Sequence, residues 1–234
     1  MTIGHGPPSG VLTLALPGTA EAAPSAARIR VRWPDARLAM DITEKAIALV
    51  LLLGAGAAIA ASGKVQPLAL VFLAPNLLVL LLVLVRRRAQ IVGEGVLDWS
   101  LPLAASVAPQ LLVAISAPPI APPWVALGCM VLGALLSFAA MVCIGKSFGI
   151  FPANRGVKQN GPYGVIRHPM YLGYALWQLG FVLANPGPAN AVVLIVALGL
   201  QVWRIEREER VLSTDPAHGV YRSRVRAKLV PLVY

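Results

Sequence analysis

Long apolar stretches separated by polar or proline-rich segments dominate the chain after about residue 40. Six such stretches occur, at 45–62, 66–85, 99–117, 124–145, 170–184 and 189–203. Most approach the roughly 20 residues that a helix needs to cross a bilayer. The fifth holds only about 15 apolar residues, or about 22 Å of helix, so we expect the last two stretches to form a shallow hairpin. The pattern predicts an all-α, polytopic integral membrane protein with five or six transmembrane helices.

Breaks in the pattern divide the chain into three parts. We assign residues 1–40 to an N-terminal tail, 41–145 to four transmembrane helices, and 146–234 to a C-terminal region that contains the hairpin. Prolines inside the stretches are expected to kink their helices, namely Pro75, Pro102 and Pro109. Small residues at helical spacing, such as Gly133 with Ser137, favour close contact between helices.

The N-terminal tail is rich in glycine, proline, alanine and serine. Its segment GVLTLALPGTAEAAP faintly resembles the core and cleavage region of a signal peptide. However, no basic region precedes it, and prolines keep its apolar run short. We therefore expect a flexible or surface-lying cytoplasmic tail rather than a cleaved signal.

Composition supports a membrane protein, because 57% of the residues are hydrophobic and only 13% are charged, against about 25% charged in soluble domains. The net charge of +10 could indicate a nucleic-acid partner. The basic residues, however, flank apolar stretches, where the positive-inside rule and anionic lipids account for them. No stacked aromatic platform accompanies them. We predict no nucleic-acid binding, and no pattern indicates an oligomeric state.

The distribution of basic residues predicts the orientation. With a cytoplasmic N-terminus and six passes, Lys64 is the only one of the 20 lysines and arginines in an outward-facing loop. Both termini are therefore expected in the cytoplasm, with the protein in a bacterial-type inner or cytoplasmic membrane. The polar segments 146–169 and 204–234 then share the cytoplasmic face, so they can build one site.

The segment GPYGVIRHPMYLGY (161–174) begins the fifth apolar stretch. Gly161 and Pro162 predict a turn. His168 precedes a proline and is biased toward extended backbone, whereas Pro169 suits the first position of a helix. We therefore expect a helix to begin at Pro169, with His168 at its cap.

Arg167 stands just before this helix start. Its planar guanidinium can hold a carboxylate or phosphate, and a helix N-terminus also attracts anions. The local pattern fits an anion site. It fits equally an interfacial arginine bound to lipid headgroups, with Tyr163 and Tyr171 as interfacial aromatic residues.

Two further polar segments can contribute chemistry. The helix end WRIEREERVL carries the neighbouring acids Glu208 and Glu209 together with Arg204. One acid can turn toward a ligand, or the whole segment is a solvated helix end with i,i+4 ion pairs. The loop 145–164 can close over a ligand or simply connect two helices.

No metal site or disulfide is predicted. The three histidines, His5, His168 and His218, are too few and too scattered for a metal cluster. Cys129 and Cys143 would lie about 21 Å apart on one helix, whereas a disulfide needs Cα atoms within about 7 Å. The chain also lacks a P-loop and a dinucleotide-binding glycine motif.

Together, GPYGVIRHPMYLGY, the apolar hairpin, WRIEREERVL, Tyr221 and KLVP resemble the isoprenylcysteine carboxyl methyltransferases and the wider group of membrane phospholipid methyltransferases. The resemblance covers about 145–231, while the spans before residue 140 match only as membrane helices. It implies an S-adenosylmethionine-dependent methyltransferase. It also implies a cytoplasmic cofactor pocket that the connecting loop and the C-terminal tail cover.

The motifs carry the family's site onto this chain. The resemblance implies cofactor-binding roles for Gly161, Pro162, Tyr163, Arg167, His168, Pro169, Tyr171, Arg204, Glu208 and Glu209, with Tyr221 and Pro231 in the tail. It implies catalytic roles for Arg167, His168 and Glu208. Physical chemistry agrees, because Arg167 can hold the cofactor's carboxylate and a glutamate can hold its ribose or amino group. A tyrosine can meet the adenine or the sulfonium.

The methyl acceptor stays open at this point. We expect a lipidic or apolar acceptor: isoprenylated thiols or carboxylates first, then phospholipid amines, then small thiols. Relatives often carry a histidine or an acid shortly before the Gly-Pro-Tyr turn, where this chain has Lys158 and Gln159. One alternative is an NADPH-dependent sterol-type reductase, in which Arg155 and Lys158 would meet the 2′-phosphate. Another is a non-catalytic membrane protein whose charged segments bind anionic lipid.

Overall fold

The computed structural model describes residues 36–61, 67–87, 91–92, 96–115 and 117–230. The chain divides into two units, 1–34 and 35–234, and the description below concerns the second. Expectations for the N-terminal tail before residue 36, for Lys64 and for Pro231 lie outside the described residues.

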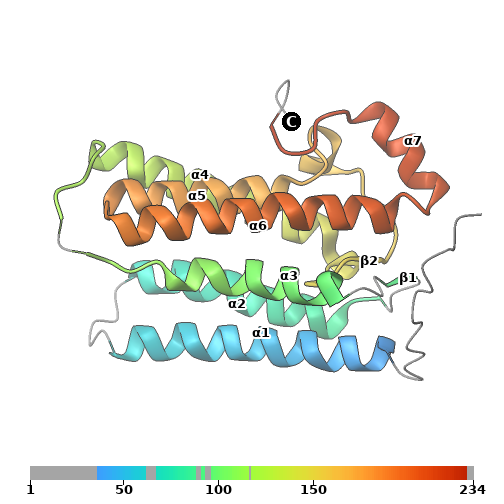
Figure 1. Ribbon diagram of the computed structural model, residues 1–234, viewed down its shortest axis with the longest axis horizontal. Helices are drawn as coiled ribbons and strands as arrows, with labels where there is room; N and C mark the ends of the chain where they lie inside the picture. Colours follow the sequence, from blue (N-terminus) through green and yellow to red (C-terminus); the bar gives the residue numbers. More distant parts are fainter. Residues whose placement is uncertain (1–35, 62–66, 88–90, 93–95, 116, 231–234) are drawn as a thin grey trace, which may run out of the picture. The chain divides into compact units, whose positions relative to one another are not determined.

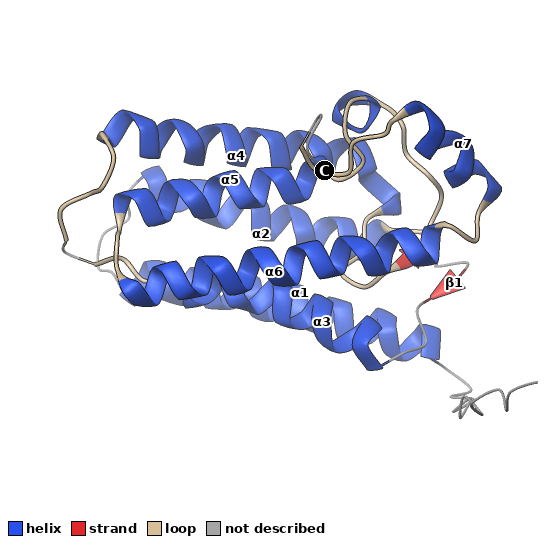
Figure 2. Cartoon of the chain, turned by 45° about the horizontal axis from the view of Figure 1, so that its top comes forward, coloured by secondary structure: helices blue, strands red, loops and turns tan. Residues whose placement is uncertain are grey.

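The described part of the chain is helical, which confirms the all-α prediction. Its helices are α1 (Ala36–Ala61), α2 (Pro67–Val85), α3 (Val96–Val107), α4 (Pro123–Ile144), α5 (Pro169–Ala184), α6 (Pro188–Leu212) and α7 (Pro216–Arg224). Short 3-10 helices are η1 (Ala108–Leu111), η2 (Gly145–Ser147) and η3 (Gly161–Gly164). Two-residue strands, β1 (Ile91–Val92) and β2 (Ala153–Asn154), pair antiparallel. Helix α1 packs on α2, α4 packs on α5, and α6 contacts both α3 and α5 (Figures 1 and 2).

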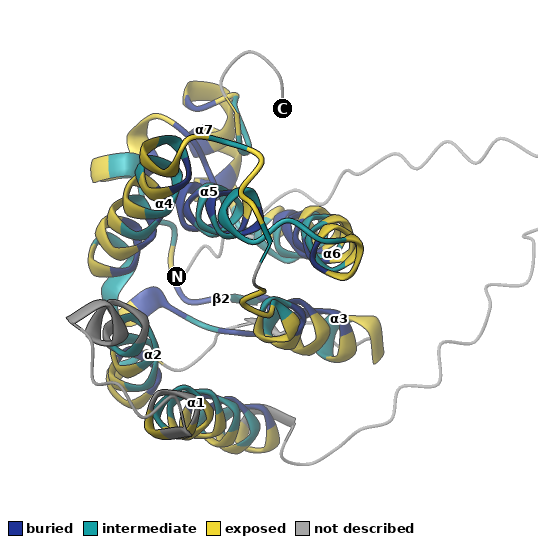
Figure 3. Ribbon diagram, turned by 90° about the vertical axis from the view of Figure 1, so that its left-hand side faces the viewer, coloured by how far each residue is buried: buried dark blue, intermediate teal, exposed yellow. Residues whose placement is uncertain are grey.

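Several helices present apolar side chains outward. Leu53 on α1, Leu132 and Leu135 on α4, and Ile195 on α6 are each more than 60% exposed, and Figure 3 shows the exposed faces of these helices. Contiguous apolar surface of this kind needs a lipid or protein partner. Two described helical segments, Pro123–Ser147 and Pro188–Leu212, are long and apolar enough to cross a membrane. The number of five or six spans stays a prediction.

The third predicted span is wrong as one continuous helix. Helix α3 ends at Val107 after 12 residues, about 18 Å of helix against the roughly 30 Å of a bilayer core. Pro109 lies in η1, which follows directly, because a proline has no N–H with which to continue the α-helical ladder. Pro75 and Pro102 do lie inside helices, as expected.

Helices α4 and α5 approach closely through small residues. A Cβ on Gly173 would lie 2.7 Å from the Gly133 carbonyl oxygen and 2.6 Å from the Ser137 backbone nitrogen. Gly180 lies equally close to the Ala126 carbonyl. The contact predicted at Gly133 and Ser137 is therefore confirmed, and it fixes α5 along α4.

The predicted hairpin of α5 and α6 turns at residues 185–187. Buried Asn190 ties this turn to the segment after η1, because its amide nitrogen donates to the carbonyls of Asn185 and Val113, both at 2.8 Å. The Val113 backbone nitrogen donates back to the Asn190 side chain at 3.1 Å. Helix α6 runs nine residues past the predicted apolar stretch, so the acidic pair lies on its last turns.

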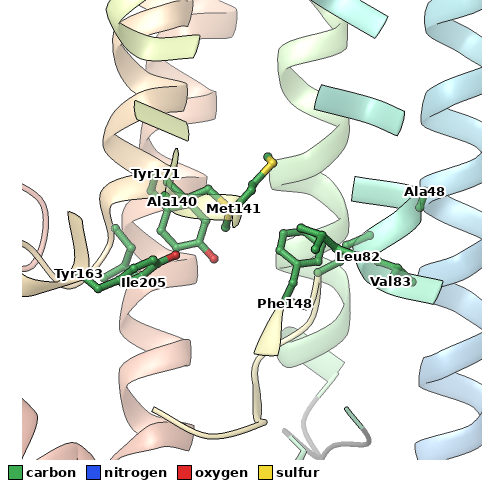
Figure 4. Packing of buried hydrophobic residues seen from close by; sticks show 11 residues of the cluster. Ala48, Leu82, Val83, Ala140, Met141, Phe148, Tyr163, Tyr171 and Ile205 are labelled. Atoms are coloured by element: carbon green, nitrogen blue, oxygen red, sulfur yellow. The ribbon is translucent and has the colours of Figure 1, made fainter. Parts of the chain in front are cut away.

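The main buried cluster lies beside the start of α5. Tyr163 and Tyr171 pack in it with Ala140, Met141 and Ile205, and Phe148 joins them to residues of α1 and α2 (Figure 4). The apolar core therefore supports the polar residues described next.

Candidate functional site

The backbone before α5 follows the predicted turn and cap. Gly161 has φ of +60°, a left-handed conformation that glycine adopts without strain, and a Cβ there would lie 2.7 Å from the Cys143 sulfur. His168 is non-helical, and Pro169 is the first residue of α5. The predicted helix start is confirmed.

Glu209 is the centre of the buried polar cluster. One of its carboxylate oxygens accepts from Arg167 Nε and contacts His168 Nε2, both at 2.9 Å. His218 Nε2 lies 3.7 Å from the same oxygen. All four residues are buried, so a charged carboxylate needs these partners to offset the cost of its burial. Glu209 thus joins the start of α5 to helices α6 and α7.

Arg167 is held largely by the protein itself. Besides Glu209, its Nη1 donates to the carbonyls of Val225 and Arg226, each at 2.8 Å. The sequence prediction of an open guanidinium fork for a ligand anion is therefore modified. One hydrogen bond thus fixes this side chain to α6, and two fix it to the segment after α7.

Glu208 is the more exposed acid of the pair. It accepts from the Tyr171 hydroxyl at 2.8 Å, and 27% of its side chain is exposed. The Tyr171 ring stacks on His168 with centroids 5.6 Å apart, and Arg204 lies over the same ring at 5.0 Å. Arg204 donates to the Ile150 carbonyl at 2.6 Å, so it braces the loop rather than forming a solvated i,i+4 pair with Glu208.

The C-terminal segment covers the start of α5. The backbone nitrogens of Arg167 and His168 donate to the carbonyls of Ala227 and Lys228, at 3.0 and 2.9 Å. The Tyr221 hydroxyl donates to the Tyr163 carbonyl at 2.7 Å. Burial raises the pKa of Tyr163 well above its usual value and that of Tyr221 to about 12, so both phenols are neutral at neutral pH. The structure thus confirms that the polar segments 146–169 and 204–234 lie together.

A half-open pocket lies where these segments meet. Its empty space is about 490 Å³ when the open mouth is counted. Six predicted site residues line it: Tyr163, Arg167, His168, Glu208, Glu209 and Tyr221. Five others lie outside this lining: Gly161, Pro162, Pro169, Tyr171 and Arg204. These five residues support the lining residues from the side away from the pocket.

Sequence reasoning missed two pocket residues. His218 was set aside because the histidines are scattered, and Arg155 was considered only for the reductase alternative. Both line the pocket, and both are buried. Lys158 lines it too, so the loop 153–158 forms one wall. The useful signal was a basic residue in a Gly- and Pro-rich loop next to the membrane.

These features define a class: a helical membrane protein with a small-ligand pocket of mixed charge at one end. Residues 122–215 match the phospholipid methyltransferase family model. This match, together with two similar isoprenylcysteine methyltransferases, confirms the resemblance drawn from the motifs.

Two curated relatives are similar to this chain. Protein-S-isoprenylcysteine O-methyltransferase A of Arabidopsis thaliana is 29% identical over 80 residues, which are 32% of this chain and 39% of that protein. Protein-S-isoprenylcysteine O-methyltransferase of Schizosaccharomyces pombe is 32% identical over 122 residues, which are 46% of this chain and 49% of that protein. The matched segments thus span less than half of either relative. No solved structure matches the chain significantly.

Proposed function

We propose that the protein is an S-adenosylmethionine-dependent membrane methyltransferase acting on a lipidic or apolar acceptor. The observation that carries the proposal is the pocket itself. The Arg-His-Pro start of α5 and the paired glutamates of α6 meet there, within the region that matches the methyltransferase family. A methyltransferase of this kind needs a small-ligand site beside the membrane.

The lining residues fit this cofactor by their chemistry. S-adenosylmethionine supplies a methyl group on a sulfonium and carries an ammonium, a carboxylate, a ribose diol and an adenine. Glu208, part-exposed at the pocket, can accept from the diol or the ammonium. The Tyr163 ring can lie against the sulfonium or the adenine. Basic groups on the same wall can take the carboxylate.

The residues contribute mainly position. Methyl transfer is an in-line displacement, so orientation of donor and acceptor supplies much of the rate. Glu209 acts through Arg167 and His168, which it holds in place. A carboxylate or thiolate acceptor needs no base. An amine or thiol acceptor must lose a proton, and His168 or Glu208 is the pocket group placed to take it.

Calorimetric titration of the purified protein in detergent tests the cofactor. S-adenosylhomocysteine should bind, and Glu208→Gln should weaken that binding. Glu206→Gln is the matched control, because Glu206 lies on the same helix but pairs with Lys228 outside the pocket lining. No binding of S-adenosylhomocysteine would sink the proposal. Binding of NADPH instead would favour the reductase alternative, to which Arg155 and Lys158 on the pocket wall give some support.

The acceptor needs a transfer assay. Radiolabelled methyl transfer to N-acetyl-S-farnesylcysteine, to phosphatidylethanolamine vesicles and to a small alkyl thiol separates the three acceptor classes. We propose the first, because both curated relatives are named isoprenylcysteine O-methyltransferases. We also propose that the pocket faces the cytoplasm, since basic residues gather at its end of the chain's apolar stretches. Labelling of Lys158 by an impermeant amine reagent in right-side-out vesicles would refute that orientation.

A further inference from the structure

Arg155 is a buried cation on the pocket wall whose role the family motifs leave unassigned. It follows β2 in the loop that lines the pocket, and it is 4% exposed. The Ser147 hydroxyl donates to its carbonyl at 3.0 Å. Its guanidinium lies over Gly149, where a Cβ would come within 2.1 Å of Nη1. Glycine at position 149 therefore leaves room for the Arg155 side chain.

The acidic neighbour of Arg155 is already well satisfied. Buried Glu44 on α1 pairs closely with Arg86 and accepts from the Phe151 backbone nitrogen at 2.6 Å. Arg155 Nη2 lies 3.4 Å from the same carboxylate, longer than the 2.7–2.9 Å typical of a charge-assisted hydrogen bond. Glu44 therefore orients Arg155 without saturating it.

Arg155 shares its acidic neighbours with other cations. Asp41 and Glu44 face Arg86 and the more exposed Lys45 as well as Arg155, and the charge of Glu208 also acts on Arg155. Burial, followed by the nearby Arg86, lowers the pKa of Arg155 to about 10. Within the described part of the chain, Arg155 Nε is buried and has no hydrogen-bond partner. A buried donor without a partner is unfavourable, and a bound anion would supply that partner.

We propose that Arg155, rather than Arg167, binds the carboxylate of the ligand's amino-acid portion. This inference rests on the proposed cofactor. Arg167 is occupied by Glu209 and two backbone carbonyls, whereas Arg155 has an unused Nε on the pocket wall. The edge formed by Nε and a terminal nitrogen matches a carboxylate with two parallel hydrogen bonds. Because Nε is shielded from solvent, a small rotation of the side chain accompanies binding.

The test compares two ligands on the full-length protein. S-adenosylhomocysteine carries the carboxylate, and its decarboxylated analogue lacks only that group. The wild type should prefer the first ligand. Arg155→Gln should weaken S-adenosylhomocysteine binding roughly 10- to 100-fold, as expected for a hydrogen bond between charged groups, and leave the analogue's affinity within about twofold. Lys146→Gln removes the same charge at an exposed residue outside the pocket lining and is the matched control. It should preserve the preference.

The outcomes separate the two proposals. If the wild type binds neither ligand, the proposed function fails, and this inference fails with it. If the wild type binds both ligands equally, or Arg155→Gln weakens both by the same factor, the inference fails alone. Titration with N-acetyl-S-farnesylcysteine distinguishes an acceptor carboxylate, because a loss confined to that ligand would overturn the assignment. Should Arg155→Gln not fold, judged by circular dichroism, Arg155→Lys keeps the charge but loses the fork and answers the same question.

Discussion

The contact between α4 and α5 predicts a large effect for one added methyl group, in Gly173→Ala. A Cβ at this position would lie 2.6 Å from the Ser137 backbone nitrogen, 2.7 Å from the Gly133 carbonyl oxygen and 2.8 Å from the Ser137 Cβ. Ordinary contacts begin at 3.4 Å, so the shortest distance falls short by 0.8 Å. Two of these atoms are backbone, so the helices themselves must move apart.

The magnitude follows from two opposing effects. Overpacking a close contact costs about 1–3 kcal/mol, and backbone atoms on both sides favour the upper half of that range. Alanine in place of a helical glycine gains up to about 1 kcal/mol. Gly173→Ala should therefore lower the free energy of unfolding by about 1–2 kcal/mol. Gly128→Ala is the matched control on α4, because a Cβ there meets nothing within 4 Å. It should be neutral or stabilising.

Thermal unfolding in detergent, followed by circular dichroism at 222 nm, measures the difference. At about 2–4 °C per kcal/mol for a chain of this size, Gly173→Ala should melt about 2–8 °C below the wild type, and Gly128→Ala should not melt below it. Since His168 caps α5 and Tyr171 lies on its first turn, Gly173→Ala should also weaken S-adenosylhomocysteine binding. Equal melting temperatures for the two variants would refute the packing argument.

Three further predictions concern polar contacts. Tyr221→Phe should lower the free energy of unfolding by about 1 kcal/mol. Burial raises the pKa of Tyr221 from 10.0 to about 12. The stability that its neutral phenol contributes is therefore present below pH 10 and is lost as the pH rises through 12. The alkaline melting profile of Tyr221→Phe should lack this loss. Glu44→Gln should cost about 3–5 kcal/mol by leaving buried arginines uncompensated, whereas Lys45→Gln, at a partly exposed pair, should cost under about 1 kcal/mol. Hydrogen bonds from Asn154 and the Ala217 backbone lower the pKa of Asp215 below 3.8. The stability that the Asp215 carboxylate contributes is therefore present above that pH and lost below it. On acidification, the melting temperature of Asp215→Asn should fall less than that of the wild type. An unchanged acid limb would contradict this.

Local rules of the backbone predicted the part of the site that lies at the start of α5. A proline fixes the first helical residue, and the residue before a proline avoids helical backbone. His168 and Pro169 obey both rules. The adjacent acids were also found, because two carboxylates beside a membrane helix stand out in a chain with so little charge. These signals come from residues that are adjacent in the sequence, so one sequence is enough to show them.

The partners of those residues could not be predicted in the same way. The Glu44 carboxylate accepts from the Phe151 nitrogen across 107 positions in the sequence. Glu44 lies just before the first apolar stretch, where no local pattern indicates this partner. The sequence also suggested that Arg204 pairs with Glu208, since helical spacing permits it. The fold turned Arg204 to the Ile150 carbonyl instead, because that loop packs against α6. Such choices depend on tertiary packing rather than on local spacing.

The site therefore extends beyond the segment that matches the methyltransferase family. That segment, 122–215, contains Arg167, His168 and the paired glutamates. The carbonyls of Val225 and Arg226, which accept from Arg167, lie after it. Glu44, which holds the Phe151 backbone and orients Arg155, lies before it. A chain reduced to the matched segment would leave buried donors at both places without acceptors, each costing about 1–3 kcal/mol. Helix α1 and the C-terminal segment are thus structural parts of the pocket, although both lie outside the matched region.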